Sequence, residues 1–425
     1  MLLERVLFRN ISGNFIIKAV SVLINILLVP IILKLFNDNS VSGFWFTFAS
    51  TFTLIFNIDF FGLNNTLRNK ISSTSIFNSK KTISDYYSVT LANLILLSST
   101  IIFLNYFIRI NEFIGISQFD LIILIFSLSL LHLLKLSISI LNADEKTSLA
   151  TLFYSFPNFL FFIFILLSNF QNIYITDLLY IFIISHLITL VFSFVYVFYY
   201  EYKYVKPQVL KISLKKYKLI ILNSFPFFLH QVSYLGLVGF NEIIFSIVYD
   251  NSVVTEYQIY FRIYNLFIIF CSLISNPYWS RFSVLVRLKN LKKIKFHYRN
   301  LQIFLVFFGL IIFIFSFTFS EQLFSLWISD QYFKFDLENS LIFSLFSISC
   351  SSLIILSSLT NGLNKIKIQS FVFSIALSVK LLVTVLIYYK FIFITWNYYI
   401  LFFSLIILLV LIFLLIYNNY NLKHV

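Results

Sequence analysis

Long apolar runs follow one another along almost the whole chain, and short polar segments separate them. Each run is long enough for a helix that crosses a hydrocarbon layer about 30 Å thick. A β-barrel would need strands of about ten residues in which polar and apolar positions alternate, and these runs are too long and too uniformly apolar for that. The pattern predicts an all-α polytopic membrane protein with twelve transmembrane helices. The predicted spans are Asn14–Leu35, Ser42–Leu63, Tyr86–Ile108, Phe119–Leu141, Leu149–Ser168, Asp177–Tyr200, Leu219–Val248, Glu256–Trp279, Leu301–Phe319, Leu337–Asn361, Ser370–Lys390 and Trp396–Tyr417.

A four-residue sequence repeats at half the length of the chain. Asp38–Val41 and Asp250–Val253 both read Asp-Asn-Ser-Val, 212 positions apart, and each lies between two apolar runs. This spacing predicts a duplication, with an N-terminal six-helix lobe at residues 1–212 and a C-terminal six-helix lobe at residues 213–425. An even number of spans per half gives both halves the same orientation, as in parallel transporter repeats. We expect Asp38 and Asp250 to be turn or helix-cap residues.

Composition supports the membrane assignment. Of the 425 residues, 60% are hydrophobic and only 11% are charged, against about 25% charged residues in soluble domains. The first run lacks a small-residue cleavage site and is expected to remain as a span.

The net charge of +14 follows from where lysine and arginine lie. One side of the predicted topology carries nearly all of them, which places both termini in the cytoplasm by the positive-inside rule. These residues then face anionic membrane lipids, and without a base-reading module we expect no nucleic-acid partner. The basic side includes Arg68–Lys81, Lys203–Lys218 and Arg281–Arg299, and the other side has Arg109, Lys334 and Lys390.

The chain has little that would support catalysis. Its five histidines are scattered without metal-ligand spacing, and no phosphate-binding glycine-rich loop occurs. Cys271 and Cys350 lie inside predicted spans, where a packed thiol behaves as a small apolar residue. We therefore expect no cofactor, no metal site and no enzymatic activity. The longest segment assigned to the outside, Ser320–Asp336, is too short for a catalytic ectodomain.

Polar and cationic residues inside the spans are the candidates for a transport pathway, because they are costly in lipid. Lys18 and Asn25 lie on one face of the first span, and Arg262 and Asn265 lie on one face of the eighth. Such stripes also serve as interhelical hydrogen bonds, which is the more common role of serine and asparagine. A permanent cation needs a partner or water, which favours an anion-binding cavity for Lys18 and Arg262. Lys18 has the alternative of reaching the cytoplasmic interface.

Two further lysines, Lys135 and Lys380, are candidates for the same role, and Lys380 is as well explained by a structural role. The buried acids Asp59 and Glu242 are either salt-bridge partners of the cations or groups that take up ions in a coupled cycle.

Three tyrosines share one face of the eighth span. Tyr260 and Tyr264 are candidates for stacking on sugar rings, whereas Tyr257 is better explained as an interface anchor. In the seventh span Pro226 is expected to kink the helix.

The end of the second span carries a family resemblance. The sequence Asn57-Ile58-Asp59-Phe60-Phe61-Gly62-Leu63 with Arg68-Asn69 resembles the Asp-Phe-Gly-Leu and Arg-Asn pattern of polysaccharide flippases, with one additional phenylalanine. These O-antigen or capsule repeat-unit translocases belong to the multidrug, oligosaccharide-lipid and polysaccharide exporter superfamily. The Asp-Arg-x-Gly-Arg-Arg loop of major-facilitator transporters is absent.

The resemblance implies two six-helix lobes around a central cavity and alternating access. The implied cargo is a polyprenyl-diphosphate-linked oligosaccharide, moved to the outer leaflet of a bacterial inner membrane, with H⁺ or Na⁺ as coupling ion and other polysaccharide assembly proteins as partners. We expect Lys18 and Arg262 to hold the diphosphate, and Asp59 or Glu242 to couple ion movement.

Two alternatives remain open. A multidrug exporter of the same superfamily would carry organic cations in a net acidic cavity, whereas here the intramembrane cations outnumber the acids. A membrane-embedded polysaccharide polymerase or acyltransferase would need a sizeable outer loop or a clustered catalytic constellation.

Overall fold

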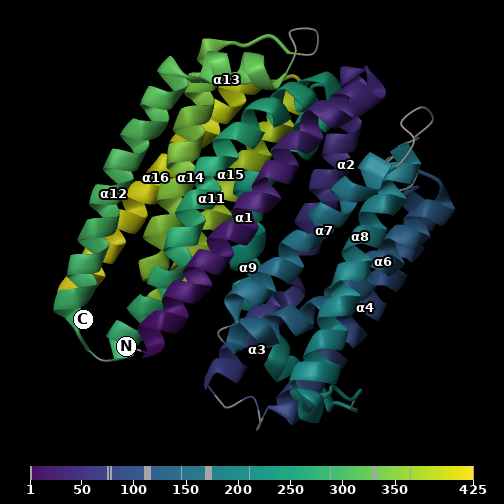
Figure 1. Cartoon of the computed structure of the whole chain (residues 1–425), viewed down its shortest axis with the longest axis vertical. Coiled ribbons are helices and arrows are strands. Elements are labelled where there is room, and N and C mark those ends of the chain that lie inside the picture. The colour runs from purple at the N-terminus through teal and green to yellow at the C-terminus, as the bar shows by residue number, and fades with distance from the viewer. Residues whose placement is uncertain are drawn as a thin grey trace. The chain divides into compact units, whose positions relative to one another are not determined.

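The computed structural model confirms the predicted fold class (Figure 1). Throughout the described part of the chain the secondary structure is helical, and twelve helices are long and apolar enough to cross a membrane. The end predicted for the fifth span, Ser168, lies outside the described residues. The structure describes the backbone of residues 2–73, 76, 79–109, 116–144, 146–167, 175–209, 211–287, 289–328, 333–363 and 365–424.

The helices that form the spans follow closely the order read from the sequence. In the first half they are α1 (Leu2–Phe36), α2 (Asn39–Asn57), η1 (Phe60–Gly62), α3 (Leu63–Ser73), α4 (Lys80–Ile108), α6 (Gln118–Ala143), α7 (Thr147–Leu167), α8 (Ile175–Val195), η4 (Tyr196–Glu201) and η5 (Lys203–Val205). In the second half they are α9 (Leu214–Gly239), α10 (Asn241–Val248), α11 (Asn251–Arg287), α12 (Leu291–Thr318), α13 (Ser320–Trp327), α14 (Leu337–Gly362), α15 (Ile366–Tyr388) and α16 (Trp396–His424).

The chain forms two compact units whose limits follow contacts and not the repeat. Unit 1 comprises Met1–Ile24 and Ile55–Phe228, and unit 2 comprises Asn25–Leu54 and Leu229–Val425. Most of α2 thus packs with the C-terminal half. The division into lobes at residue 212 stays a prediction about the duplication.

The core of unit 1 is built around α6, which packs against α3, α4, α7 and α8. The helix is apolar on several faces, as expected for a helix surrounded by others, and Leu131, Leu136 and Ile140 are completely buried. In unit 2 the corresponding position belongs to α14, which packs against α11, α12 and α16. Its serines allow close approach of neighbouring helices, and Ser347 donates a hydrogen bond to the backbone oxygen of Tyr264 at 3.0 Å.

The two copies of the repeated motif form the same cap, which confirms that prediction. The carboxylate of Asp38 accepts a hydrogen bond from the backbone of Ser40 at 2.7 Å, and that of Asp250 accepts one from the backbone of Ser252 at 2.5 Å. The first turns of α2 and α11 also contact each other inside unit 2. The hydroxyl of Thr255 donates to the backbone oxygen of Asn39 at 2.6 Å.

Gly43 makes the close approach of those two turns possible. A Cβ atom built on Gly43 would lie 1.7 Å from the backbone oxygen of Asn251 and 3.0 Å from the hydroxyl of Thr255. A side chain at position 43 would therefore force α2 and α11 apart.

Within the residues that the structure describes, two of the predicted spans are interrupted. The second span breaks after α2 and resumes at η1 and α3, with Phe61 and Gly62 at positive φ angles of 56° and 70°. The seventh span passes through Pro226 as a continuous helix and breaks at Phe240, between α9 and α10. The kink expected at Pro226 stays a prediction, because a proline can bend a helix without ending it.

Gly62 is the residue on which the first interruption depends. Its positive φ disfavours any residue with a side chain by about 1–2 kcal/mol, and a Cβ atom there would lie 2.0 Å from the backbone oxygen of Ser224 in α9. We expect Gly62→Ala to lower the midpoint of thermal unfolding in detergent clearly, measured by fluorescence-detected gel filtration after heating.

Gly309→Ala in α12 is the matched control. A Cβ atom there meets Ile348 at an ordinary 3.7 Å, and replacing a glycine inside a helix by alanine contributes about 0.5–1 kcal/mol of stability. Equal midpoints for the two variants would show that the Gly62 turn does not limit stability.

Candidate functional site

At the interruption in unit 1, a lysine from another helix donates hydrogen bonds to the end of α2. The ammonium group of Lys135, in α6, donates to the backbone oxygens of Phe56 at 2.6 Å and Asn57 at 3.2 Å, at the end of α2. The Lys135 side chain is 4% exposed, and its ammonium lies 4.9 Å from the centre of the Phe56 ring and 5.6 Å from that of Tyr154. The cation replaces the helical hydrogen bonds that the last carbonyls of α2 lack.

An acid caps the start of the helix that follows the same interruption. The carboxylate of Asp59 accepts hydrogen bonds from the backbone N–H groups of Asn64 at 2.8 Å and Asn65 at 2.9 Å, in the first turn of α3. Asp59 is 3% exposed. A negative charge at a helix start and a positive charge at a helix end both interact favourably with the helix dipole.

Unit 2 repeats this arrangement with different residues. The ammonium of Lys380, in α15, donates to the backbone oxygens of Gly236 at 3.0 Å and Leu237 at 2.8 Å, and to the side-chain oxygen of Asn241 at 2.7 Å. Lys380 is completely buried. After the break, Glu242 lies in the first turn of α10 and accepts a hydrogen bond from Gln258 at 2.6 Å.

These contacts favour a structural role for two of the candidate lysines. Lys135 and Lys380 are each buried and bonded to the end of an interrupted helix, and their expected contact with substrate stays a prediction. Their donors satisfy carbonyls that have no water to bond to in a membrane. For Lys380 this is the structural role that the sequence left open.

The tyrosines of α11 lie in the core of unit 2. Tyr260 and Tyr264, the candidates for stacking on sugar rings, are completely buried, and a contact with sugar stays a prediction. The hydroxyl of Tyr260 bonds to the backbone of Asp336, and that of Tyr264 bonds to Ser316 at 2.8 Å and Ser340 at 2.6 Å.

Tyr257 is also completely buried and accepts a hydrogen bond from Asn241 at 3.1 Å, so it is a core residue and not an interface anchor. The face that the tyrosines share therefore packs against α12 and α14. The three-and-four spacing of buried residues is the same for a protein neighbour as for a ligand, which is why the sequence could not separate the two.

Lys18 and Arg262 remain the candidate cations. Lys18 in α1 and Arg262 in α11 are half-buried, and within the described part of the chain no ion pair forms with either. The Nε atom of Arg262 is buried without a hydrogen-bond partner. Glu242 interacts electrostatically with this guanidinium but bonds to Gln258 instead. Asn25 and Asn265 are half-buried as well.

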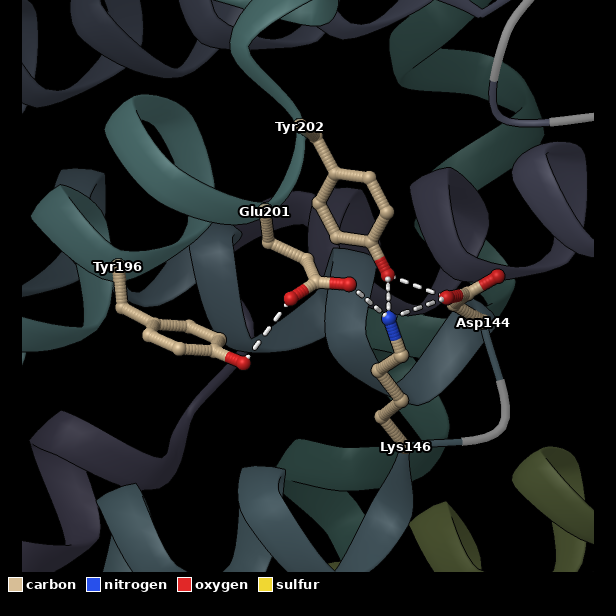
Figure 2. A network of polar contacts seen from close by, with 5 residues as sticks. All are labelled: Asp144, Lys146, Tyr196, Glu201 and Tyr202. Atoms are coloured by element: carbon tan, nitrogen blue, oxygen red, sulfur yellow. Dashed lines mark hydrogen bonds and ion pairs between the residues drawn. The ribbon is translucent and has the colours of Figure 1, made fainter.

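A charged network at the loop end of α6 was not anticipated (Figure 2). Lys146 bonds to Glu201, to the Tyr202 hydroxyl at 3.0 Å and to Asp144 at 3.1 Å, and Tyr202 donates to Asp144. Burial works against the charge on Lys146, but these hydrogen bonds outweigh it and hold the pKa of the ammonium above its ordinary value. The network ties the turn between α6 and α7 to η4.

Thr90 and Asn93 of α4 were not predicted as site residues. Together with Asp59, Asn64 and His132 they line a small cavity inside unit 1. The signal in the sequence was weak, because a threonine and an asparagine three positions apart in an apolar span are common in helix packing.

We expect Lys380→Met to destabilise the protein strongly. The variant keeps the length of the side chain but removes the donors to Gly236, Leu237 and Asn241, and each buried acceptor left unsatisfied costs about 1–3 kcal/mol. Lys367→Met is the matched control, because Lys367 is exposed on the same helix. The midpoints of thermal unfolding in detergent measure both, and an unchanged midpoint for Lys380→Met would contradict the structural role.

No protein-family model and no curated protein matches the chain. Solved structures do. A MOP superfamily transporter from Pyrococcus furiosus, described as having a binding pocket of reverse polarity that suggests a different function, aligns over 97% of this chain and 94% of its own with 13% identity and a TM-score of 0.69.

Structures of a multidrug resistance MATE family transporter of the MOP superfamily align equally well. The outward-facing conformation gives a TM-score of 0.68 with 14% identity, over 99% of this chain and 96% of that chain. The inward-facing conformation gives 0.70 with 12% identity, over 97% and 95%. At these identities the comparison shows the fold, and the chain therefore has the twelve-helix fold of the MATE transporters.

Proposed function

We propose that this protein is a flippase that moves a polyprenyl-diphosphate-linked oligosaccharide from the cytoplasmic to the outer leaflet of a bacterial inner membrane by alternating access. Support comes from the fold, which it shares with transporters, and from the sign of the charges in its spans. A diphosphate and a glycan cannot enter hydrocarbon, so protein cations and amides have to replace their water. An inside-negative potential favours outward movement of an anion by about 2.3 kcal/mol per charge per 100 mV.

The observation that carries the proposal is the difference between the intramembrane cations. Lys135 and Lys380 are bonded to helix ends, whereas Lys18 and Arg262 have no ion pair among the described residues. A cation held inside a membrane protein without a counterion is costly unless an anion or water reaches it. Phosphate oxygens form charge-assisted hydrogen bonds with arginine and lysine. We assign Lys18 and Arg262 to the diphosphate.

The amides near these cations fit the glycan part of the cargo. Asn25 follows Lys18 by seven positions and Asn265 follows Arg262 by three, so each amide lies on the same helix face as its cation. Both side chains are half-buried, and amides donate and accept hydrogen bonds with sugar hydroxyls. Asp59 and Glu242 are the acids for ion coupling, with H⁺ or Na⁺ as the ion.

Lys18→Ala and Arg262→Ala are expected to reduce surface polysaccharide in the host at least about tenfold, because a hydrogen bond to a charged group contributes about 1.5–3 kcal/mol. The readout is surface polysaccharide per amount of protein in the membrane.

Each variant has a matched control on its own helix. Lys34 in α1 and Arg281 in α11 are exposed, and their alanine variants should support normal surface polysaccharide. Full activity of Lys18→Ala and Arg262→Ala at normal membrane levels would refute the assignment of the diphosphate.

A second candidate function follows from the comparisons, because the structures with the same fold include a multidrug resistance transporter. Deletion of the gene in its host separates the two. The flippase proposal expects lipid-linked oligosaccharide to accumulate facing the cytoplasm. Normal surface glycan together with new sensitivity to cationic dyes would establish the exporter instead.

A further inference from the structure

A small cavity lined by polar residues and by Phe60, Leu63 and Leu94 lies beside Asp59 inside unit 1. Its volume is about 10 Å³, roughly the space that one water molecule needs. Asp59 and Asn64 line it from the interruption of the second span, Thr90 and Asn93 from α4, and His132 from α6. The site is distinct from Lys18 and Arg262, to which we assign the cargo.

Three of the residues that line the cavity have polar atoms without a partner. These are the hydroxyl of Thr90, the side-chain nitrogen of Asn93 and Nε2 of His132. The three residues are only 7%, 3% and 3% exposed. Buried polar groups are almost always hydrogen-bonded, so three such atoms around one cavity indicate an occupant that bonds to them.

The chemistry of these atoms selects the occupant. The side-chain oxygen of Asn93 accepts a hydrogen bond from Tyr217, which leaves the N–H₂ group of Asn93 as a donor. The His132 ring bonds to the backbone of Ile55, so its Nδ1 carries the hydrogen and Nε2 is an acceptor. A water molecule accepts from Asn93 and donates to His132 at the same time.

A sodium ion fits these groups poorly. Hard cations require several oxygen ligands, but both carboxylate oxygens of Asp59 already accept backbone hydrogen bonds, and Asn93 presents hydrogen atoms. The side-chain oxygen of Asn64 accepts from Ser139 at 3.2 Å. The nearby ammonium of Lys135 interacts electrostatically with Asp59 and His132 and would repel a second cation.

We propose that the cavity holds one water molecule through which Asp59 takes up and releases a proton, so that unit 1 binds H⁺ and not Na⁺. The proton comes from the aqueous phase, an O–H bond forms on the Asp59 carboxylate, and that group then donates to the water, which donates to His132. Release reverses these steps. The place of this proton in transport rests on the proposed function, whereas the binding itself does not.

Protonation changes the start of α3. The ionised carboxylate caps Asn64 and Asn65 and lies at the positive end of the helix, and a neutral acid loses the charge and weakens the cap. The charged and titratable groups that face Asp59 are Lys135 and His132 of α6, Tyr154 of α7 and Tyr86 of α4. Lys135 remains bonded to α2 in either state, so protonation of Asp59 alters one side of the interruption only.

Hydrogen–deuterium exchange of purified full-length protein in nanodiscs, without cargo, tests the proposal. The probe is the exchange rate of the Asn64 and Asn65 amides in the wild type divided by that in Asp59→Asn, which is the neutral isostere of the protonated acid. The ratio cancels the intrinsic effect of pH on exchange. At high pH we expect the Asn64 and Asn65 amides to exchange roughly tenfold more slowly in the wild type than in Asp59→Asn. This difference should disappear as the pH is lowered, and it should be the same in sodium chloride and in choline chloride.

Two variants sharpen the test. His132→Phe removes the acceptor for the water, and the pH at which protection is half lost should fall by about half a unit to one unit. Asp85→Asn is the control, since Asp85 of α4 pairs with Lys216 at 2.5 Å. In this variant the protection of the Asn64 and Asn65 amides should depend on pH as it does in the wild type. If Asp59→Asn does not fold, two other measurements show whether Asp59 takes up a proton. One is the difference in pH dependence between the wild type and His132→Phe, and the other is the infrared carbonyl band of a carboxylic acid, which should appear at low pH.

Protection that is independent of pH, or that depends on sodium, overturns the proposal. If protection follows pH as described but host polysaccharide is normal without the gene, the proton site stands and the cargo assignment fails. If polysaccharide transport is confirmed and protection does not follow pH, the flippase stands and the proton site fails.

Discussion

A membrane offers no water to bond with the backbone, and this protein interrupts two of its spans in spite of that constraint. At each interruption a lysine from a distant helix bonds to the last carbonyls before the break, and an acid lies at the start of the helix after it. Breaking a helix exposes carbonyls at one end and N–H groups at the other, so the charges of Lys135 and Asp59, and of Lys380 and Glu242, match the ends that they serve. The positions of α3 and α10 depend on these pairs.

The same constraint explains why the cations of the spans fall into two groups. Lysines that satisfy helix ends are completely or almost completely buried, whereas Lys18 and Arg262 are half-buried and have no ion pair among the described residues. A buried charge with its partners in place stabilises a fold, and a charge without them needs a ligand or water. The number of cations inside the spans is therefore larger than the number that is available to bind an anion.

Fold class and span number were readable from the sequence because twelve long apolar runs allow few other structures. The motif cap at Asp38 and Asp250 was equally readable, since it depends on residues two positions apart. The roles of Lys135 and Tyr264 were not, because their partners lie 79 and 52 positions away in the chain. A helical stripe says which residues share a face, but it does not say whether a helix or a ligand covers that face.

The contact between the two copies of the repeated motif has a geometric consequence. Thr255 bonds to Asn39, and Gly43 lies against Asn251. Adding 212 to 39 and 43 gives 251 and 255, so the two contacts exchange roles when the halves are exchanged. Reciprocity of this kind is the property of an isologous interface in a two-fold dimer. At the first turns of α2 and α11, each copy of the motif therefore meets the other through the same pair of positions.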